Sequence, residues 1–374
     1  MSHDMLPESK NRLEQCESIR GLAILLVFCF HYFGDLRGYL AYPDMKTGMG
    51  LLYGGNTGVT LFFLLSGFLI SRPFLQGAPL QIRNFLSRRA LRILPMFYVS
   101  ILIGAVISQQ WGNVLKSMFF YDIGLGTLSP MGAVWWSLAV EVQFYLVLPL
   151  LIWLARRPGW RLLLIPLLAA LLYGYMLIRS APLTEDWSGW RDSIIGRWPV
   201  FLTGAVLAWV YIVFGERLQE YGRKQAWVGL VLVVLALGLL VLLCDHRVRT
   251  YGIFAHGLWY DYYMLDGLAW GLFVFALLNF RFFGYRLFVN PLLHHLGIWS
   301  YSIYLLHSGV LFFALRHEPL WLPSSRIEIV LTGLVLLGVA TLLSALTYRY
   351  IERPFLRVRP NWSAARASSS VLAN

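Results

Sequence analysis

The stretch ESIRGLAILLVFCFHYFGDLRGYL, residues 17–40, is apolar enough for a membrane helix but carries two side chains that hydrocarbon disfavours. Arg20 stands near its start and His31 well inside it. Three helical turns separate them, so both side chains share one face, and His31 lies roughly 16 Å further along the axis. Because histidine is the usual proton carrier near neutral pH, His31 indicates a functional site. The alternative is a histidine that only packs and hydrogen-bonds against a neighbouring helix.

The rest of the chain has the composition of a polytopic membrane protein. Of its 374 residues, 58% are hydrophobic and 13% are charged, whereas soluble domains carry roughly 25% charged residues. A helical span needs roughly 20 apolar residues, and ten stretches qualify. They are 18–38, 57–76, 91–109, 134–155, 161–178, 197–214, 226–243, 262–280, 297–315 and 327–348. The predicted fold is an all-α integral membrane protein with about ten transmembrane helices.

Positive charge orients these predicted spans. If the N-terminus is cytoplasmic, 21 of the 31 Lys and Arg residues lie in cytoplasmic segments, so the positive-inside rule predicts that both termini are cytoplasmic. The net charge of +12 then reflects basic loops, and no nucleic acid partner is predicted. Cys29 lies inside a predicted span, so the three cysteines imply no disulfide framework.

An arginine cluster precedes the third predicted span. The segment FLSRRALRILPMFYVS, residues 85–100, contains Arg88, Arg89 and Arg92. Arg89 and Arg92 are three residues apart and share a helix face, and paired guanidinium groups bind phosphate through forked hydrogen bonds. The alternative is charge that only sets the topology.

The fourth predicted span carries a polar face. In VWWSLAVEVQFYLVLPLL, residues 134–151, Ser137, Glu141 and Tyr145 follow at i, i+4 and i+8. A carboxylate inside a membrane must be paired or protonated. Glu141 could orient a base, bind a substrate hydroxyl, or hold helices together through an arginine.

A second polar face is predicted in GIWSYSIYLLHSGVLFF, residues 297–313. Ser300, Tyr304 and His307 lie at i, i+4 and i+7, and Tyr301 is one position round the helix. Two histidines inside predicted spans, His31 and His307, raise the question of a metal site. Neither has a carboxylate or cysteine at ligand spacing, so no metal site is predicted.

The second predicted span has a seam of small residues. In GNTGVTLFFLLSGFLISRPFL, residues 55–75, Gly55, Gly58 and Gly67 with Ser66 would let another helix approach closely. Ser66 lies within a helix and lacks the G-x-S-x-G turn, so packing is favoured over a nucleophilic role.

Five of these segments, with Glu352–Phe355 at the end of the last predicted span, together resemble the acyltransferase 3 family of integral membrane acyltransferases. They run in family order from Arg20 to Phe355, and the family also has ten core spans. The matching segments are RGLAIL with the following His31, Gly58–Ile70, Ser87–Pro95, Trp136–Tyr145, Ser300–His307 and Glu352–Phe355.

The resemblance implies transfer of an acyl group, often acetyl, from acyl-coenzyme A to a hydroxyl of a carbohydrate or similar acceptor at the membrane. The family's arginine and histidine match Arg20 and His31, and its arginine pair matches Arg89 and Arg92, with Arg88 beside them. Glu141 matches an acidic residue of the family's fourth-span motif. The predicted catalytic residues are therefore His31 and Glu141. The predicted donor-binding residues are Arg20, Arg88, Arg89 and Arg92.

The remaining predicted roles are supporting ones. Ser137, Tyr145, Tyr301, Tyr304 and His307 are expected to support the substrate, and Ser137, Tyr145 or Tyr301 to donate a hydrogen bond to the oxyanion. Residues 1–360 are expected to form the membrane-embedded core. Residues 361–374 are expected to form a short disordered cytoplasmic tail, without the appended hydrolase-like domain of many relatives.

The expected mechanism uses acyl-coenzyme A as a co-substrate, without a tightly bound cofactor. His31 would act as general base, and an acyl-histidine intermediate is the alternative. The expected location is the bacterial cytoplasmic (inner) membrane, with membrane lipids and a carbohydrate or lipid-linked glycan as partners. The rival hypothesis is a transporter or flippase for a glycan or lipid-linked sugar. The identity of the acceptor stays open.

Overall fold

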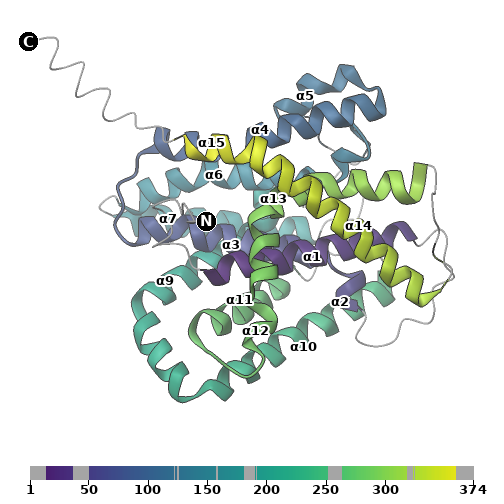
Figure 1. Cartoon of the computed structure of the whole chain (residues 1–374). Helices are drawn as coiled ribbons and strands as arrows, with labels where there is room; N and C mark the ends of the chain where they lie inside the picture. The colour runs from purple at the N-terminus through teal and green to yellow at the C-terminus, as the bar shows by residue number, and fades with distance from the viewer. Residues whose placement is uncertain are drawn as a thin grey trace, which may run out of the picture. The chain divides into compact units, whose positions relative to one another are not determined.

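The computed structural model describes residues 14–36, 50–121, 123, 126–156, 159–180, 190, 192–251, 263–317, 323 and 325–358. Every regular element in these ranges is a helix, as predicted (Figure 1). The long helices are α1 (Glu14–Leu36), α3 (Thr57–Leu75), α4 (Ile82–Ser108), α6 (Trp136–Ala155), α7 (Trp160–Ser180), α9 (Ile194–Lys224), α10 (Ala226–Tyr251), α11 (Tyr263–Asn279), α13 (Pro291–Phe312) and α14 (Arg326–Thr347). The short ones are α2 (Gly50–Tyr53), η2 (Trp111–Asn113), α5 (Val114–Met118), η3 (Met131–Val134), α12 (Tyr285–Phe288), η5 (Phe313–His317), η6 (Tyr348–Glu352) and α15 (Arg353–Arg357). The predicted tail, 361–374, lies outside the described residues.

Each of the ten predicted spans overlaps one long helix. Within the described ranges, eight helices are long and apolar enough to cross a membrane. Helix α11 is apolar but has only 17 residues, and α7 is not among the eight. A multi-pass membrane protein is supported, while ten crossings and cytoplasmic termini stay predictions.

Several helix ends differ from the prediction. Helix α4 begins at Ile82 rather than at 91, α10 continues to Tyr251 rather than 243, and α13 begins at Pro291 rather than 297. The arginine cluster, predicted to precede its span, therefore lies inside α4. His294 and His295 also lie inside α13. Hydropathy marks only the apolar middle of a helix, whereas the backbone hydrogen bonds favour continuing it through polar residues.

The chain divides into two compact units, and the first contains residues 1–72 and 199–301. In this unit α10 packs along α11 and against α2, and α2 also contacts α1. Its core is aromatic and aliphatic, with Ile24, Phe68, Trp270 and Phe273 almost fully buried. This packing holds α1, which carries Arg20 and His31.

The small-residue seam on α3 is confirmed inside the first unit. A Cβ atom at Gly67 would overlap the backbone carbonyl of Phe201 in α9, and one at Gly204 would overlap that of Leu64. Reciprocal glycines thus bring the two backbones into contact. Close approach of this kind replaces the hydrophobic driving force that is lacking between helices in lipid.

The second unit contains residues 73–198 and 302–374 and is organised around α4. Helix α4 contacts α5, η3, α6, η6 and α15, and α6 contacts α7. The Phe97 ring of α4 stacks on Phe120, with 4.6 Å between centroids, and meets Trp135 edge-on at 5.5 Å. These contacts position the arginines of α4 beside the polar face of α6.

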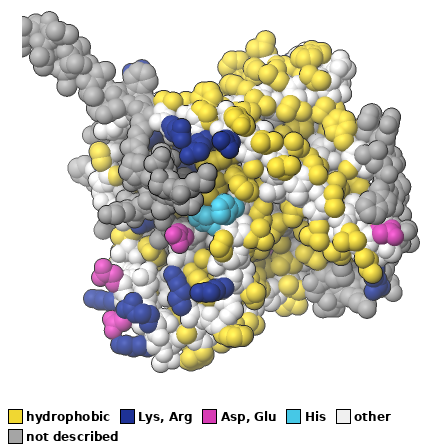
Figure 2. Space-filling model, viewed as in Figure 1, with side chains coloured by type: hydrophobic (Ala, Val, Ile, Leu, Met, Phe, Trp, Pro, Cys, Tyr) yellow, Lys and Arg dark blue, Asp and Glu magenta, His cyan; other side chains and the backbone are white. Residues whose placement is uncertain are grey.

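Large apolar side chains remain on the surface of both units. On α14, Ile327, Val330, Leu334 and Leu342 are all exposed. Figure 2 shows hydrophobic side chains over broad areas of the face that it draws, with Lys and Arg gathered in separate groups. Exposed apolar surface of this extent suits contact with lipid.

Candidate functional site

His31 lies in the last two turns of α1 and is half-buried. Its Nδ1 is 3.0 Å from the backbone carbonyl of Val27, and the edge of the Phe30 ring packs beside it, with 5.0 Å between centroids. A carbonyl can only accept, so Nδ1 must carry the proton in this contact. In the neutral ring, Nε2 then holds the lone pair, which is the form that a general base requires.

Two further histidines, both on α13, make the same kind of contact. His307 Nδ1 is 3.0 Å from the Ile303 carbonyl, and His295 Nδ1 is 2.7 Å from the Pro291 carbonyl. His307 is fully buried whereas His295 is exposed. The tautomer alone therefore does not distinguish His31 from His295 and His307.

Arg20 lies near the start of α1, as the sequence predicted. Its Nη2 donates to Ser300 Oγ of α13 at 3.0 Å, and its Nε is 3.7 Å from Glu17. The guanidinium also lies 5.8 Å from the centre of the Phe62 ring. Arg20 thus joins α1, α3 and α13 in the first unit, so it has a packing role besides any role in binding.

Arg89 of α4 lies beside two aromatic rings in the second unit, and these rings also meet each other edge-on with 6.3 Å between centroids. Its guanidinium carbon is 5.6 Å from the centre of the Phe85 ring and 5.5 Å from that of Tyr145. Its Nε is buried and has no hydrogen-bond partner among the residues that the structure describes. A guanidinium stacked on rings in this way keeps its planar fork for an anion.

Glu141 and Tyr145 form the predicted polar face of α6. The Tyr145 hydroxyl donates a short hydrogen bond to Glu141 Oε1, and Tyr145 is buried. The spacing of four residues predicted that both side chains share one helix face, and the structure adds a hydrogen bond between them. Because the Tyr145 proton is directed at Glu141, Tyr145 in this arrangement serves the carboxylate rather than an oxyanion.

Ser137 is also directed at a protein partner. Its Oγ is 2.7 Å from the Tyr304 hydroxyl, and that hydroxyl is 2.8 Å from the Val134 carbonyl. Ser137 Oγ is also 3.3 Å from the Val134 carbonyl, so either hydroxyl can be the donor between Ser137 and Tyr304. The Tyr304 ring lies 6.0 Å from that of His307, so these residues join α6, η3 and α13 in the second unit.

The other predicted residues lie on the same helices. Arg88 is exposed, Arg92 is half-buried on α4, and Tyr301 is half-buried on α13. The structure thus brings together Arg20 and Ser300 in the first unit. It brings together Arg89, Glu141 and Tyr145 in the second, and there also Ser137, Tyr304 and His307.

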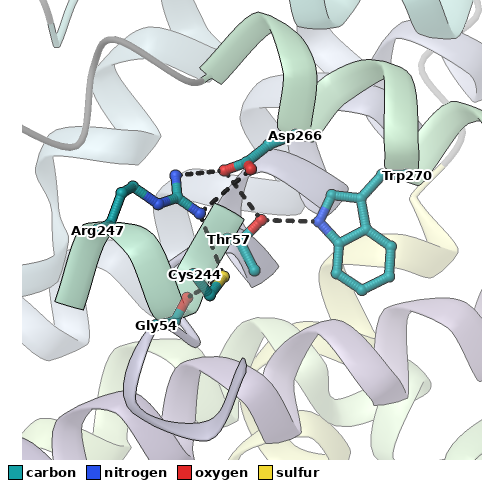
Figure 3. Close-up of polar contacts among 6 residues, drawn as sticks. All are labelled: Gly54, Thr57, Cys244, Arg247, Asp266 and Trp270. Carbon is teal, nitrogen blue, oxygen red and sulfur yellow. Dashed lines mark hydrogen bonds and ion pairs between the residues drawn. The ribbon is translucent and has the colours of Figure 1, made fainter. Parts of the chain in front are cut away.

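Sequence reasoning missed a buried polar network in the first unit, drawn in Figure 3. Arg247 of α10 forms two hydrogen bonds with Asp266 of α11, at 2.6 and 3.1 Å, and both side chains are at most 1% exposed. The Thr57 hydroxyl donates to Asp266 at 3.3 Å and accepts from Trp270 Nε1 at 2.9 Å. The available signal was Asp266, a carboxylate inside a predicted span.

The chain matches the family model described as an acyltransferase domain over residues 15–349. It is 25% identical to the O-acetyltransferase OatA of Staphylococcus aureus over 81% of this chain and 53% of that protein. It is 28% identical to the peptidoglycan O-acetyltransferase OatA of Listeria monocytogenes over 38% of this chain and 24% of that protein. It is 27% identical to the acyltransferase MdmB of Streptomyces mycarofaciens over 41% of this chain and 42% of that protein.

The matched regions therefore span about half or less of these relatives. No solved structure matches the chain. The family match covers nearly all described helices, from α1 to η6. The chain belongs to the acyltransferase domain family, and it is a membrane-embedded member.

Proposed function

We propose that this protein transfers an acyl group, acetyl in the first instance, from cytoplasmic acyl-coenzyme A to a hydroxyl of a saccharide or related acceptor. The observation that carries the proposal is Arg89. Its guanidinium lies in an aromatic setting inside a membrane protein, and its buried Nε has no hydrogen-bond partner among the residues that the structure describes. Such a group suits the phosphates of a coenzyme.

The proposed chemistry assigns the base to His31. As the acceptor oxygen bonds to the thioester carbonyl carbon, its proton passes to His31 Nε2. Collapse of the tetrahedral intermediate breaks the carbon–sulfur bond, and the imidazolium returns the proton to the coenzyme A thiolate. General-base help of this kind contributes about 10²–10⁴-fold. Transfer through an acyl-histidine would use the same nitrogen as nucleophile.

The other predicted residues have supporting roles in this proposal. Arg88 and Arg92 would add positive charge near the donor phosphates, and Arg20 of α1 is proposed as a further donor-binding residue. Glu141 would hold Tyr145 beside Arg89. The acceptor is proposed to be a carbohydrate because the relatives from Listeria and Staphylococcus are named as O-acetyltransferases, the former of peptidoglycan.

The first test measures donor binding. Acetyl-coenzyme A is titrated calorimetrically into the detergent-purified wild type and into Arg89→Ala, His31→Ala and Arg223→Ala. Arg223 is an exposed arginine near the end of α9 and serves as the charge-matched control. Arg89→Ala should weaken binding about 10–100-fold, because hydrogen bonds to charged groups contribute about 1.5–3 kcal/mol. His31→Ala and Arg223→Ala should bind like the wild type.

The second test measures turnover as release of the coenzyme A thiol, with and without saccharide acceptors. His31→Ala should lower turnover about 10²–10⁴-fold, whereas His295→Ala should not. His295 makes the same Nδ1 contact to a carbonyl but is exposed. Near-normal turnover in His31→Ala would remove the base assignment. A folded wild type that does not bind acetyl-coenzyme A would instead favour the transporter hypothesis.

A further inference from the structure

The turn between α2 and α3 packs directly on the part of α1 that carries His31. A Cβ atom at Gly55 would overlap the carbonyl of Leu26 and approach Phe30 Cβ to 3.2 Å. One at Gly58 would overlap the carbonyl of Ala23 and approach Val27 Cγ2 to 3.1 Å. No side chain fits between, so this turn and α1 are in backbone contact.

The contacted part of α1 fixes the His31 ring. Val27, which packs against Gly58, is the residue whose carbonyl accepts from His31 Nδ1. On the other side of His31 along α1, the Phe33 ring packs on Tyr53 of α2, with 5.0 Å between centroids. A shift of residues 53–58 along α1 would therefore move the groups on both sides of His31.

The network in Figure 3 fixes the position of this turn. At the C-terminal end of the turn, Thr57 donates to Asp266 at 3.3 Å and accepts from Trp270 at 2.9 Å. The residues before the turn are held by α10. Asp245 accepts from the Gly50 amide at 2.6 Å, and Cys244 Sγ lies 3.8 Å from the Gly54 carbonyl. Helices α10 and α11 thus hold both ends of the segment 50–57.

Asp266 is a fixed anchor for Thr57. Arg247 holds both carboxylate oxygens of Asp266, in a pair that is essentially inaccessible to solvent. Two parallel charge-assisted hydrogen bonds constrain orientation as well as distance. The carboxylate therefore cannot turn to follow Thr57, and the Thr57 hydroxyl must stay where Asp266 and Trp270 meet it.

We infer that Thr57 and Asp266 are positioning residues for His31, acting through the turn that packs on Val27. This inference rests on the proposed role of His31 as the base. A base displaced by a fraction of an ångström loses much of its rate advantage, because proton transfer requires a near-attack geometry. The Arg247–Asp266 pair is the rigid end of this chain of contacts.

The test compares Thr57→Val with Thr60→Val. Thr60 lies one turn further along α3, is fully buried, and its hydroxyl has no hydrogen-bond partner among the described residues. Both variants replace a hydroxyl by a methyl group, but only Thr57→Val breaks the link to Asp266. Thr57→Val should lower kcat about tenfold without changing the KM for acetyl-coenzyme A. Thr60→Val should leave both constants unchanged, and Thr57→Ser should restore kcat.

A spectroscopic measurement keeps the inference testable if Thr57→Val folds poorly. Trp270→Phe keeps an aromatic ring but removes the Nε1 donor to Thr57. In protein labelled with ¹⁵N-histidine, the His31 signals, assigned by their loss in His31→Ala, should shift in Trp270→Phe and not in Thr60→Val. Unshifted signals together with an unchanged kcat would overturn the inference.

The outcomes also separate this inference from the proposed function. Normal turnover in His31→Ala would overturn the proposed function itself. A strong dependence on His31, combined with a Thr57→Val enzyme that matches Thr60→Val in kcat, would overturn only the positioning role of Thr57.

Discussion

Arg247 in the first unit and Arg89 in the second both lie in apolar helices near a carboxylate, but their surroundings differ. Arg247 donates to both oxygens of Asp266 and to Cys244 Sγ, and it is 1% exposed. Arg89 lies against two aromatic rings, and the carboxylate near it, Glu141, accepts from Tyr145 instead. Within the described residues, Arg247 is paired with a carboxylate, whereas Arg89 has ring contacts and only a longer-range electrostatic interaction with Glu141.

The difference separates a structural arginine from one suited to a ligand. A paired buried charge stabilises the arrangement of α10, α11 and the turn before α3, and breaking such a pair is costly. An arginine with stacking contacts alone is held in place but keeps hydrogen-bonding capacity. We therefore expect substitutions at Asp266 to affect folding and substitutions at Arg89 to affect binding.

The largest effect is expected for Asp266→Ala. It leaves the Arg247 charge buried without its carboxylate, so the free energy of unfolding should fall by about 3–5 kcal/mol. The double variant Arg247→Met with Asp266→Leu removes both charges and should recover most of that loss. Thermal unfolding in detergent measures both. A loss below about 1 kcal/mol for Asp266→Ala would show that the Arg247–Asp266 pair contributes no more than an exposed ion pair.

The next effect concerns stabilisation by the donor. At one hundred times its Kd, acetyl-coenzyme A should stabilise the wild type by about 2.7 kcal/mol. Arg89→Ala should lose about half or more of this stabilisation at the same donor concentration, while its unfolding without donor should be nearly unchanged. Arg223→Ala is the control that should keep the full stabilisation. If Arg89→Ala unfolds much earlier without donor, the contrast between the two arginines fails.

Local features of the fold were predictable because hydropathy and spacing report them directly. The ten apolar stretches each became a helix, and the spacing of Glu141 and Tyr145 predicted the shared face on which they meet. The helix ends were less predictable, because arginine-rich segments can continue a helix beyond its apolar part. The beginning of α4 and the end of α10 both illustrate this.

Contacts between distant segments were not predictable in the same way. Arg20 and Ser300 are 280 residues apart in the chain, and no local pattern links them. The predicted span 226–243 ends before Arg247, so nothing in the sequence indicated its pairing with Asp266. A carboxylate in a predicted span implies a partner, but only the packing of α10 on α11 identifies that partner as Arg247.

A smaller effect is expected for Tyr145→Phe. The variant keeps the ring against Arg89 but removes the donor to Glu141, so it should lower the free energy of unfolding by about 1–2 kcal/mol. A double-mutant cycle with Glu141→Gln isolates the contribution of this pair. A coupling free energy near zero would show that Glu141 has another main partner in the protein.

The smallest effect is expected for Cys244→Ala. The Cys244 sulfur accepts from Arg247 Nη2 at 3.2 Å, but a thiol is a weak acceptor, and both bonds from Arg247 to Asp266 remain. The free energy of unfolding should fall by about 1 kcal/mol or less. If the loss instead equals that of Asp266→Ala, the stability of this region depends on the packing of Cys244 against the Gly54 turn rather than on the ion pair. The contrast between Arg247 and Arg89 would then concern shape more than charge.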